Sequence, residues 1–373
     1  MPTEPPTPAR RGDKPQGAFE SILWWGRSDP DYARNGILRR CLGDAGYRIV
    51  DFRPRISFLG DVEAALRLKT PVSLVWVPCF RQRDLRAARR FSARRQVPMV
   101  FDPLISAYDK QVFERGKISE DSARARRLRQ WERQLFALAD LVLADTEGHA
   151  EFFRDTLEVS ERRIRVVPMS ADEALFQPTP AKAARGDAAE VLFFGSFIPL
   201  QGPEVIIEAA NRYQGPPVRW RLVGDGPLLA ACRARVGRGV PVEFEEWLPY
   251  RALAARIAEA GIVLGIFGNT PKSSRVVPNK VCQALACGRP LITRASPAYA
   301  KGLCAQVDSG ITWVPPDDPD ALAHAVAGLA SAPQTLQEQG RRAYASYRRY
   351  FSTERAADAL SLALASLPPT LAQ

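Results

Sequence analysis

Short apolar runs alternate with helix-like segments along almost the whole chain, and this alternation constrains the fold more than any other feature. Strands that alternate with helices pair in parallel, and helices then cover both faces of the sheet. The strand-like runs fall into two groups. The first comprises residues 21–25, 48–52, 72–77, 97–101, 140–145 and 164–168, and the second comprises residues 191–194, 218–223, 242–244, 261–267, 290–293 and 313–315. The sequence therefore predicts an α/β protein with two doubly wound halves.

A polar stretch rich in proline and alanine separates the two groups of strands. We expect residues 179–187 to be a linker between an N-terminal domain at 19–178 and a C-terminal domain at 188–349. Residues 1–18 are proline-rich and polar, which is typical of a disordered tail and not of a secretory signal. Ligands of doubly wound sheets bind at the carboxyl ends of the strands, so a cleft between the domains is the expected site.

The composition argues against several classes of protein. No apolar run approaches the roughly 20 residues that span a bilayer. The six cysteines are scattered without a Cys-x-x-Cys pair, a pattern typical of reduced thiols in the cytoplasm. The two histidines are too few for a histidine-rich metal site. We therefore expect a cytoplasmic protein that requires no metal and no cofactor.

The formal net charge of +11 predicts an anionic partner. Much of the excess lies between Arg81 and Arg95, where Leu85, Ala88 and Phe91 form an apolar stripe at helical spacing. One interpretation is a helix that lies on the anionic inner face of the plasma membrane. The other is a helix packed on the domain core with a solvated basic face. Nucleic acid is not expected, because the basic run lacks interleaved aromatic residues and no binding motif is present.

The segment from Arg275 to Thr293 places a loop at the start of a helix. A helix is predicted from about Pro278 to Gly288, between two strand-like runs. Backbone N–H groups at a helix start suit a phosphate. Lys280 adds a point charge there, and Arg275 adds a planar fork. An ordinary strand–helix–strand unit gives the same pattern, so this segment alone leaves both interpretations open.

An ordered set of motifs resembles the family 4 glycosyltransferases, also called group 1 glycosyl transferases. The motifs are residues 101–104, 139–146, 193–196, 222–227, 247–250 and 283–290. The resemblance covers nearly the whole chain after the tail. It implies the GT-B fold, in which two Rossmann-like domains face each other across a cleft and a C-terminal helix, here about 350–367, packs back on the first domain.

The same resemblance implies an activity. Such enzymes move a sugar from a nucleotide diphosphate, of UDP, GDP or ADP type, to an acceptor hydroxyl with retention of configuration. We expect a role in the biosynthesis of cell-envelope polysaccharide, glycolipid or another glycoside, with a glycan, lipid-linked or small-molecule acceptor. The donor contacts that the resemblance implies are Gly195, Ser196, Gly224, Asp225, Trp247, Leu248, Pro278, Asn279, Lys280 and Gln283. A tryptophan in the core is an equally consistent interpretation of Trp247.

Two departures from the family's pattern affect the expected chemistry. The usual Glu-x7-Glu motif aligns with Arg275 and Gln283, and neither residue is acidic. The cations that the family often carries in the first glycine loop are replaced by Ser196 and Gln201. We expect Arg275 and Lys280 to stabilise the departing diphosphate in their place. A sugar-nucleotide epimerase or hydrolase on the same fold, or a catalytically silent partner protein, remains an alternative.

The acceptor side offers candidates in the first domain. Asp102 occupies a strand end at which many relatives carry a histidine, and a carboxylate there would accept the proton of the acceptor hydroxyl or orient the nucleophile. Turn capping is the alternative role for Asp102, and Asp109 is the second candidate. Arg34 is expected either to contact a donor or acceptor phosphate or to lie on a helix surface. His149 is expected at the surface or at a helix cap.

Overall fold

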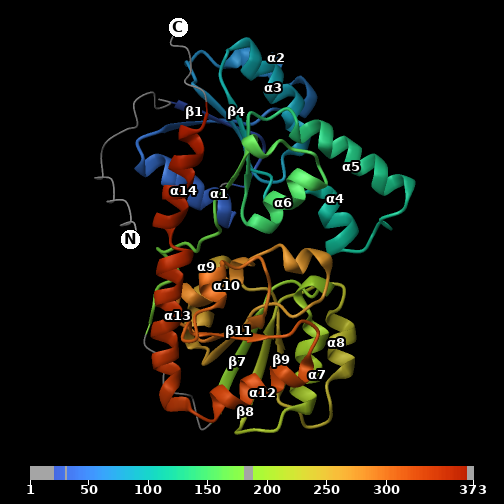
Figure 1. The fold of residues 1–373 in the computed structure, drawn as a ribbon, viewed down its shortest axis with the longest axis vertical. Helices are drawn as coiled ribbons and strands as arrows, with labels where there is room; N and C mark the ends of the chain where they lie inside the picture. Colours follow the sequence, from blue (N-terminus) through green and yellow to red (C-terminus); the bar gives the residue numbers. More distant parts are fainter. Residues whose placement is uncertain (1–20, 30–31, 180–187, 368–373) are drawn as a thin grey trace, which may run out of the picture.

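The computed structural model describes residues 21–29, 32–179 and 188–367 (Figure 1). They form two α/β domains, each built on one six-stranded parallel sheet. The predicted doubly wound fold is therefore confirmed. The predicted tail at 1–18 and nearly all of the predicted linker at 179–187 lie outside the described residues.

The sheet of the first domain has the strand order β2-β1-β3-β4-β5-β6. Its strands are β1 (Ser21–Trp25), β2 (Arg48–Phe52), β3 (Leu74–Val77), β4 (Met99–Phe101), β5 (Leu141–Ala144) and β6 (Ile164–Val166). Strands β1, β3, β4 and β5 are buried along their whole length, as expected for a parallel sheet with both faces covered. The chain reverses its direction across the sheet between β1 and β3, so this pair is the topological switch point of the domain.

The sheet of the second domain has the order β12-β11-β10-β7-β8-β9. Its strands are β7 (Ala189–Phe194), β8 (Val218–Val223), β9 (Val242–Glu245), β10 (Ile262–Leu264), β11 (Leu291–Arg294) and β12 (Ile311–Val314). Here the switch point lies between β7 and β10, which pair in parallel. The loops that follow these two strands are therefore the expected ligand loops of this domain.

Helices cover both sheets. The first domain contains α1 (Ala33–Asp44), α2 (Gly60–Arg67), α3 (Leu85–Arg94), α4 (Ala107–Asp109), α5 (Ala123–Phe136) and α6 (Glu147–Asp155), together with the short turns η1 (Ser57–Leu59), η2 (Gln82–Asp84) and η3 (Lys110–Glu114). The second contains α7 (Pro203–Arg212), α8 (Leu229–Arg235), α9 (Tyr250–Glu259), η6 (Pro271–Ser274), α10 (Asn279–Ala286), α11 (Lys301–Cys304), α12 (Pro319–Ala330) and α13 (Leu336–Tyr350).

The C-terminal helices run along one side of the molecule from the second domain to the first (Figure 1). Helix α14 (Thr353–Ala365) follows α13 almost directly and packs against α1. Leu360, Ala363 and Leu364 of α14 share one buried cluster with Ile37 and Leu38 of α1. The end of the chain thus contributes apolar surface to the first domain's core.

Helix α3 carries the basic run found in the sequence. Its apolar stripe of Leu85, Ala88 and Phe91 is buried in the core of the first domain. Arg90 and Arg94 both pair with Asp61 of α2. The interpretation of this helix as a surface that inserts its apolar stripe into lipid is therefore wrong, since that stripe is already covered by protein.

Candidate functional site

Two glycine turns meet at the carboxyl edge of the second sheet. Gly195 follows β7 and Gly224 follows β8, and both have φ of +138°. A Cβ atom on Gly224 would lie 2.0 Å from the carbonyl oxygen of Gly195, so a side chain there is excluded by both space and backbone conformation. The two turns can approach each other closely only because both residues are glycine. The Gly195 turn follows β7, one of the two strands of the switch point, and the Gly224 turn packs against it from the neighbouring strand β8.

Lys280 lies in the first turn of α10, and its ammonium group is buried beneath the Gly195 turn. The side chain is 5% exposed, and Nζ lies 3.8 Å from the centre of the Phe193 ring. A Cβ atom on Gly195 would be 3.1 Å from Nζ. Within the described residues Nζ has no hydrogen-bond partner, and burial lowers the pKa of Lys280 well below its usual value. The sequence predicted that Lys280 places a point charge at the helix start. In the structure its ammonium group is instead buried beside the Gly195 turn.

The carboxamide of Gln201 approaches the same place. Its Oε1 would be 3.7 Å from a Cβ atom on Gly195, and it too lacks a hydrogen-bond partner within the described chain. Gln201 occupies a position at which the family often has a lysine. Lys280 of α10 thus places a cation at the Gly195 turn, where this chain has Gln201 in place of the family's lysine.

The remaining predicted donor residues lie along the same edge but differ in exposure. Ser196 and Asn279 are half-buried beside the glycine turn and at the start of α10, whose N-cap is Pro278. Trp247 is 62% exposed after β9, so the alternative interpretation as a core tryptophan is wrong. The side chain of Gln283 is buried, Asp225 is exposed, and Leu248 packs on the core of the second domain.

Arg275 does not stand free for a diphosphate in this structure. Its Nη2 atom donates to Oδ1 of Asp109 at 2.5 Å, and its guanidinium lies over the Phe152 and Phe113 rings. The backbone carbonyl of Arg275 also accepts a hydrogen bond from Thr146 Oγ1 of the first domain. Arg275 therefore joins the two domains, and a phosphate would have to compete with Asp109 for its fork.

Asp109 is fully buried in the contact between the domains. Besides Arg275, it lies 3.8 Å from the ammonium of Lys272 and 3.7 Å from Nε2 of His149. Burial alone would raise the pKa of Asp109, but His149, Lys272 and Arg275 together lower it. The prediction that Asp109 contacts the acceptor is not supported by this geometry, because its carboxylate is enclosed by these cations.

Asp102 and Arg34 form a second buried ion pair. Arg34 Nε donates to both carboxylate oxygens of Asp102, at 2.8 and 2.9 Å, and Nη1 donates to the carbonyl oxygen of Val167. Arg34 is 2% exposed and Asp102 is 0% exposed. Neither the surface role nor the phosphate role predicted for Arg34 fits this pairing. Asp102 likewise does not face an acceptor as a base, since Arg34 takes both of its oxygens.

His149 lies in the first turn of α6, next to the helix cap as predicted, but the predicted surface role is wrong because the side chain is buried. It lies in α6 and is 1% exposed, with Nδ1 hydrogen-bonded to Asp145 Oδ1. Burial would lower the pKa of His149, but Asp145 and Asp109 outweigh it and raise the pKa to about 9. Thr146 caps the helix by accepting from the His149 amide. The signal in the sequence was the spacing of four between Asp145 and His149, directly after a strand.

A cavity of about 910 Å³ lies between the domains beside this charged cluster. Asp145 and Thr146 of the first domain line it, and Arg275 lines it from the second. Its other lining residues are Glu147, Gly148, Glu151, Phe152, Asp155, Val166, Pro168, Met169, Ser274, Val277, Pro297, Ala298, Tyr299, Ala300, Lys301, Tyr350 and Phe351. Arg275 is the one predicted catalytic or donor residue among these.

Two protein-family models match the chain. The model described as glycosyl transferases group 1 matches residues 188–332, and the one described as a glycosyl transferase 4-like domain matches residues 13–169. The two matches cover the second and the first domain respectively. They agree with the resemblance drawn from the motifs.

Curated relatives and solved structures are also similar to the chain. D-inositol 3-phosphate glycosyltransferases of Kribbella flavida and Segniliparus rotundus are each 29% identical, over 57% and 61% of this chain and 53% of each relative. The chain thus matches about half the length of these relatives. The fold resembles HepE of Anabaena in complex with UDP and glucose (TM-score 0.67, 15% identity, 94% of this chain and 100% of that chain). It also resembles sucrose-phosphate synthase of Thermosynechococcus elongatus (TM-score 0.67, 18% identity, 92% of this chain and 98% of that chain).

Proposed function

The chain belongs to the group 1 glycosyl transferases, and from that premise we propose that it transfers a sugar from a nucleotide diphosphate to an acceptor hydroxyl with retention of configuration. The relatives named above act as glycosyltransferases, and one structural neighbour holds UDP and glucose. Both facts support a nucleotide-sugar donor for this chain. The proposed role is in cell-envelope polysaccharide, glycolipid or other glycoside biosynthesis.

The buried ammonium of Lys280 is the observation that carries this proposal. A lysine without a partner in a low-dielectric site is unfavourable unless an anion joins it. Nζ lies beside the empty side-chain position of Gly195, at the switch point where ligands of such sheets bind. A phosphate that binds over Gly195 would come within reach of this group and raise its pKa back toward the usual value.

The loops around Lys280 fit the departure of a diphosphate. Transfer of the sugar leaves negative charge on the leaving group, and fixed N–H donors and cations lower the barrier by stabilising that charge. The amides of Gly195 and Ser196 and the N-terminus of α10 provide such donors. The exposed Trp247 lies at the same edge and offers a face for a nucleobase. This chemistry requires no metal ion or other cofactor.

Sugar transfer is tested by incubating the full chain with labelled UDP-, GDP- and ADP-sugars and a panel of glycan, lipid-linked and small-molecule acceptors. The proposal predicts a product whose anomeric configuration, read by NMR, matches that of the donor. Epimerised or hydrolysed donor in the absence of acceptor would instead identify the sugar-nucleotide epimerase or hydrolase alternative. Nucleotide binding without any product would favour a silent partner protein, and an inverted product would contradict retention.

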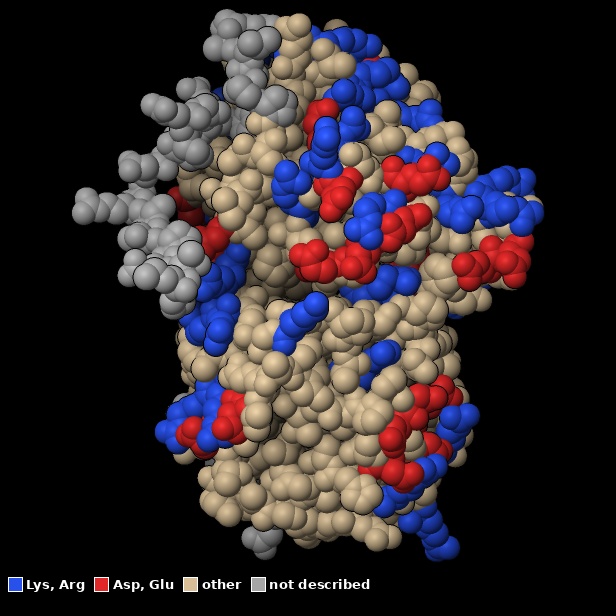
Figure 2. Space-filling model, in the orientation of Figure 1, with Lys and Arg blue, Asp and Glu red and all other residues tan. Residues whose placement is uncertain are grey.

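We also place the protein at the inner face of the plasma membrane, with η1 and α2 as the contact. No helix in the described parts of the chain is long and apolar enough to cross a bilayer. The exposed apolar residues of this surface are Ile56, Phe58, Leu59, Val62 and Leu66. Lys and Arg side chains gather over the part of the first domain near α2 and α3 (Figure 2). Apolar side chains near cations suit the interface of an anionic bilayer.

Co-sedimentation with vesicles that contain anionic lipid tests this placement. Phe58→Ser with Leu66→Ser should reduce the bound fraction several-fold, because these side chains are 65% and 78% exposed. Leu362→Ser on α14 is the matched control, since Leu362 is 74% exposed but lies on another surface. Equal sedimentation of all three proteins would contradict membrane contact through η1 and α2.

A further inference from the structure

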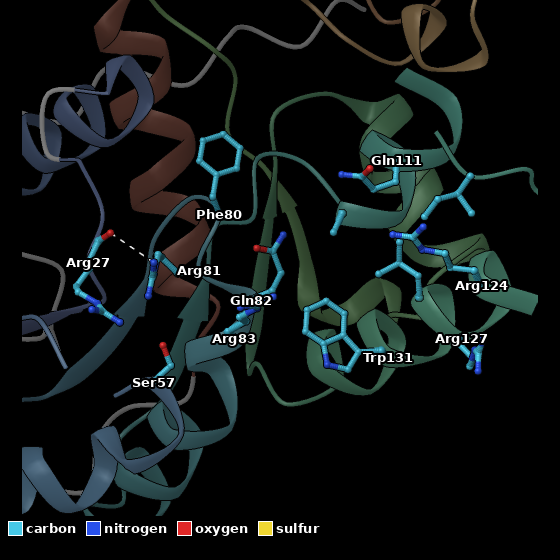
Figure 3. Close-up of a pocket in the computed structure, with 13 residues that line it drawn as sticks. Arg27, Ser57, Phe80, Arg81, Gln82, Arg83, Gln111, Arg124, Arg127 and Trp131 are labelled. Atoms are coloured by element: carbon cyan, nitrogen blue, oxygen red, sulfur yellow. Dashed lines mark hydrogen bonds between the residues drawn. The ribbon is translucent and has the colours of Figure 1, made fainter. Parts of the chain in front are cut away.

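A second cavity, of about 740 Å³, lies at the switch point of the first domain (Figure 3). Arg27 follows β1, and the segment Phe80–Arg83 follows β3, so the two strands of the switch point each supply part of its wall. Helix α5 forms the opposite wall. Because ligands of doubly wound sheets bind outside the carboxyl ends of the strands at this point, the cavity has the expected place of a substrate site.

The lining of this cavity is strongly cationic. Five arginines contribute to it, and none of its lining residues is acidic. They are Arg27, Arg81, Arg83, Arg124 and Arg127. Arg81 pairs with Asp84, whereas the other four make no ion pair with any described residue. In α3, by comparison, Arg89, Arg90 and Arg94 pair with carboxylates and only Arg86 bonds to an amide, so the cavity has a larger share of arginines available to a ligand.

Aromatic and amide groups complete the wall. Trp131 is half-buried in α5, and Phe80 is 41% exposed with φ of +64°. Gln82 and Gln111 also line the cavity, and Gln82 is fixed by donating to the carbonyl oxygen of Ile105. Figure 3 shows the arginines on two sides, with Trp131 and Gln82 between them. Indole faces and amides are suited to a sugar ring next to a charged group.

The carboxylate behind the wall does not neutralise this charge. Glu132 is buried and accepts hydrogen bonds from Ser106 Oγ and from the amides of Ala107 and Tyr108. It also lies 3.5 Å from Nε2 of Gln82. Its hydrogen bonds fix the backbone at Ala107, which lines the cavity.

We infer that this cavity binds the phosphate or diphosphate group of the acceptor, so that the acceptor substrate is a phosphorylated molecule. Guanidinium forks bind phosphate oxygens in pairs, and several forks around one cavity favour a dianion over a neutral sugar. The inference rests on the proposed function, since it names the substrate of the acceptor side. The phosphate can belong to a water-soluble sugar phosphate or to a lipid-linked one, and the two share this chemistry.

Calorimetric titration of the full chain with inorganic pyrophosphate tests the site, in the presence of saturating nucleotide so that the donor loops are filled. Arg124→Gln with Arg127→Gln should weaken pyrophosphate binding by about tenfold or more. Arg126→Gln with Arg129→Gln is the matched control, because it removes the same charge from the same helix at residues that do not line the cavity. The control should change the affinity by less than about twofold.

Further probes define the ligand class. Binding of glucose 1-phosphate would identify a soluble acceptor, and preferential binding of farnesyl diphosphate would identify a lipid-linked one. Tighter binding of glucuronate than of either probe would overturn the phosphate assignment. The site itself would be overturned if both double arginine variants lost pyrophosphate binding equally. It would also be overturned if the wild type bound no pyrophosphate. Nucleotide binding, measured separately in each variant, shows whether the donor side is intact when this inference fails.

Discussion

The two switch points of the molecule present cations in different ways. In the second domain, the ammonium of Lys280 is buried beside the Gly195 turn and has no hydrogen-bond partner among the described residues. In the first domain, four arginines without an ion pair in the described parts of the chain line a cavity that is open to solvent. A buried cation fixes one phosphate position and strengthens its interaction through the low dielectric, whereas exposed forks are screened and adapt to several ligands. The difference suggests a fixed donor group on one side and a variable acceptor on the other.

Replacing Lys280 should have the largest effect. Lys280→Met removes the cation beside Gly195 and should lower the rate of sugar transfer by about 10²- to 10³-fold. The same change should stabilise the free protein by about 1 kcal/mol, because it removes a buried amine that has no hydrogen-bond partner in the described part of the chain. Transfer assays and chemical denaturation measure the two effects. Lys69→Met, at an exposed position, is the control, and a parallel fall in stability and activity would argue for a merely structural lysine.

Replacing Asp109 should weaken the contact between the domains. Asp109→Asn removes the charge that faces Arg275, Lys272 and His149, and should lower the free energy of unfolding by about 3 kcal/mol. Urea denaturation measures the change. Asp155→Asn is the matched control, since Asp155 pairs with its exposed neighbour Arg154, and it should show no measurable change. Equal free energies of unfolding for the two variants would mean that the buried charge of Asp109 does not stabilise the protein.

The pH dependence of the free energy of unfolding tests how much His149 contributes to stability. Its pKa is about 9 in the folded protein and 6.5 in the unfolded chain, so its contribution is complete below pH 6.5 and is lost as the pH rises toward 9. The total is up to about 3 kcal/mol. His149→Gln should flatten this part of the profile, whereas His324→Gln, at the other histidine, should not. An unchanged profile in His149→Gln would place the titration elsewhere.

Removal of metal ions should have the smallest effect. The proposed mechanism stabilises the departing diphosphate with amides and Lys280, so EDTA should change the rate of sugar transfer by less than about twofold. The measurement compares initial rates with and without the chelator, and with Mg²⁺ added back. Loss of activity that Mg²⁺ restores would show that the cation at the donor loops is a metal ion and not the protein's own side chain.

The fold was predictable from the sequence because its signals are local. Apolar runs bounded by turns mark the strands, and the segments found at 21–25, 48–52 and 218–223 coincide with β1, β2 and β8. The start of α10 after Pro278 was equally clear, since proline is tolerated there. Helix α2 was missed, because it has only eight residues; Val62 and Leu66 have the spacing of a buried stripe, yet both face solvent.

The candidate site was only partly predictable, because its geometry depends on contacts between distant segments. The buried pair of Arg34 and Asp102 joins residues 68 positions apart, so nothing local distinguishes it from a phosphate contact and a base. The ammonium of Lys280 lies over the ring of Phe193 in β7, a contact between distant segments that spacing does not reveal. Arg275 was placed correctly in the loop before α10, but its partner Asp109 is 166 positions away. The spacing of motifs along the sequence identified these residues, but it did not show which residues they pair with.

Calorimetric titration with UDP, GDP and ADP in two buffers of different ionisation enthalpy tests the central claim most directly. One of the three nucleotides should bind the wild type with an uptake of protons that grows as the pH is raised, because the diphosphate raises the lowered pKa of Lys280. Lys280→Met should bind more weakly and take up no proton. Failure of all three nucleotides to bind, or identical proton uptake by the wild type and Lys280→Met, would contradict the account.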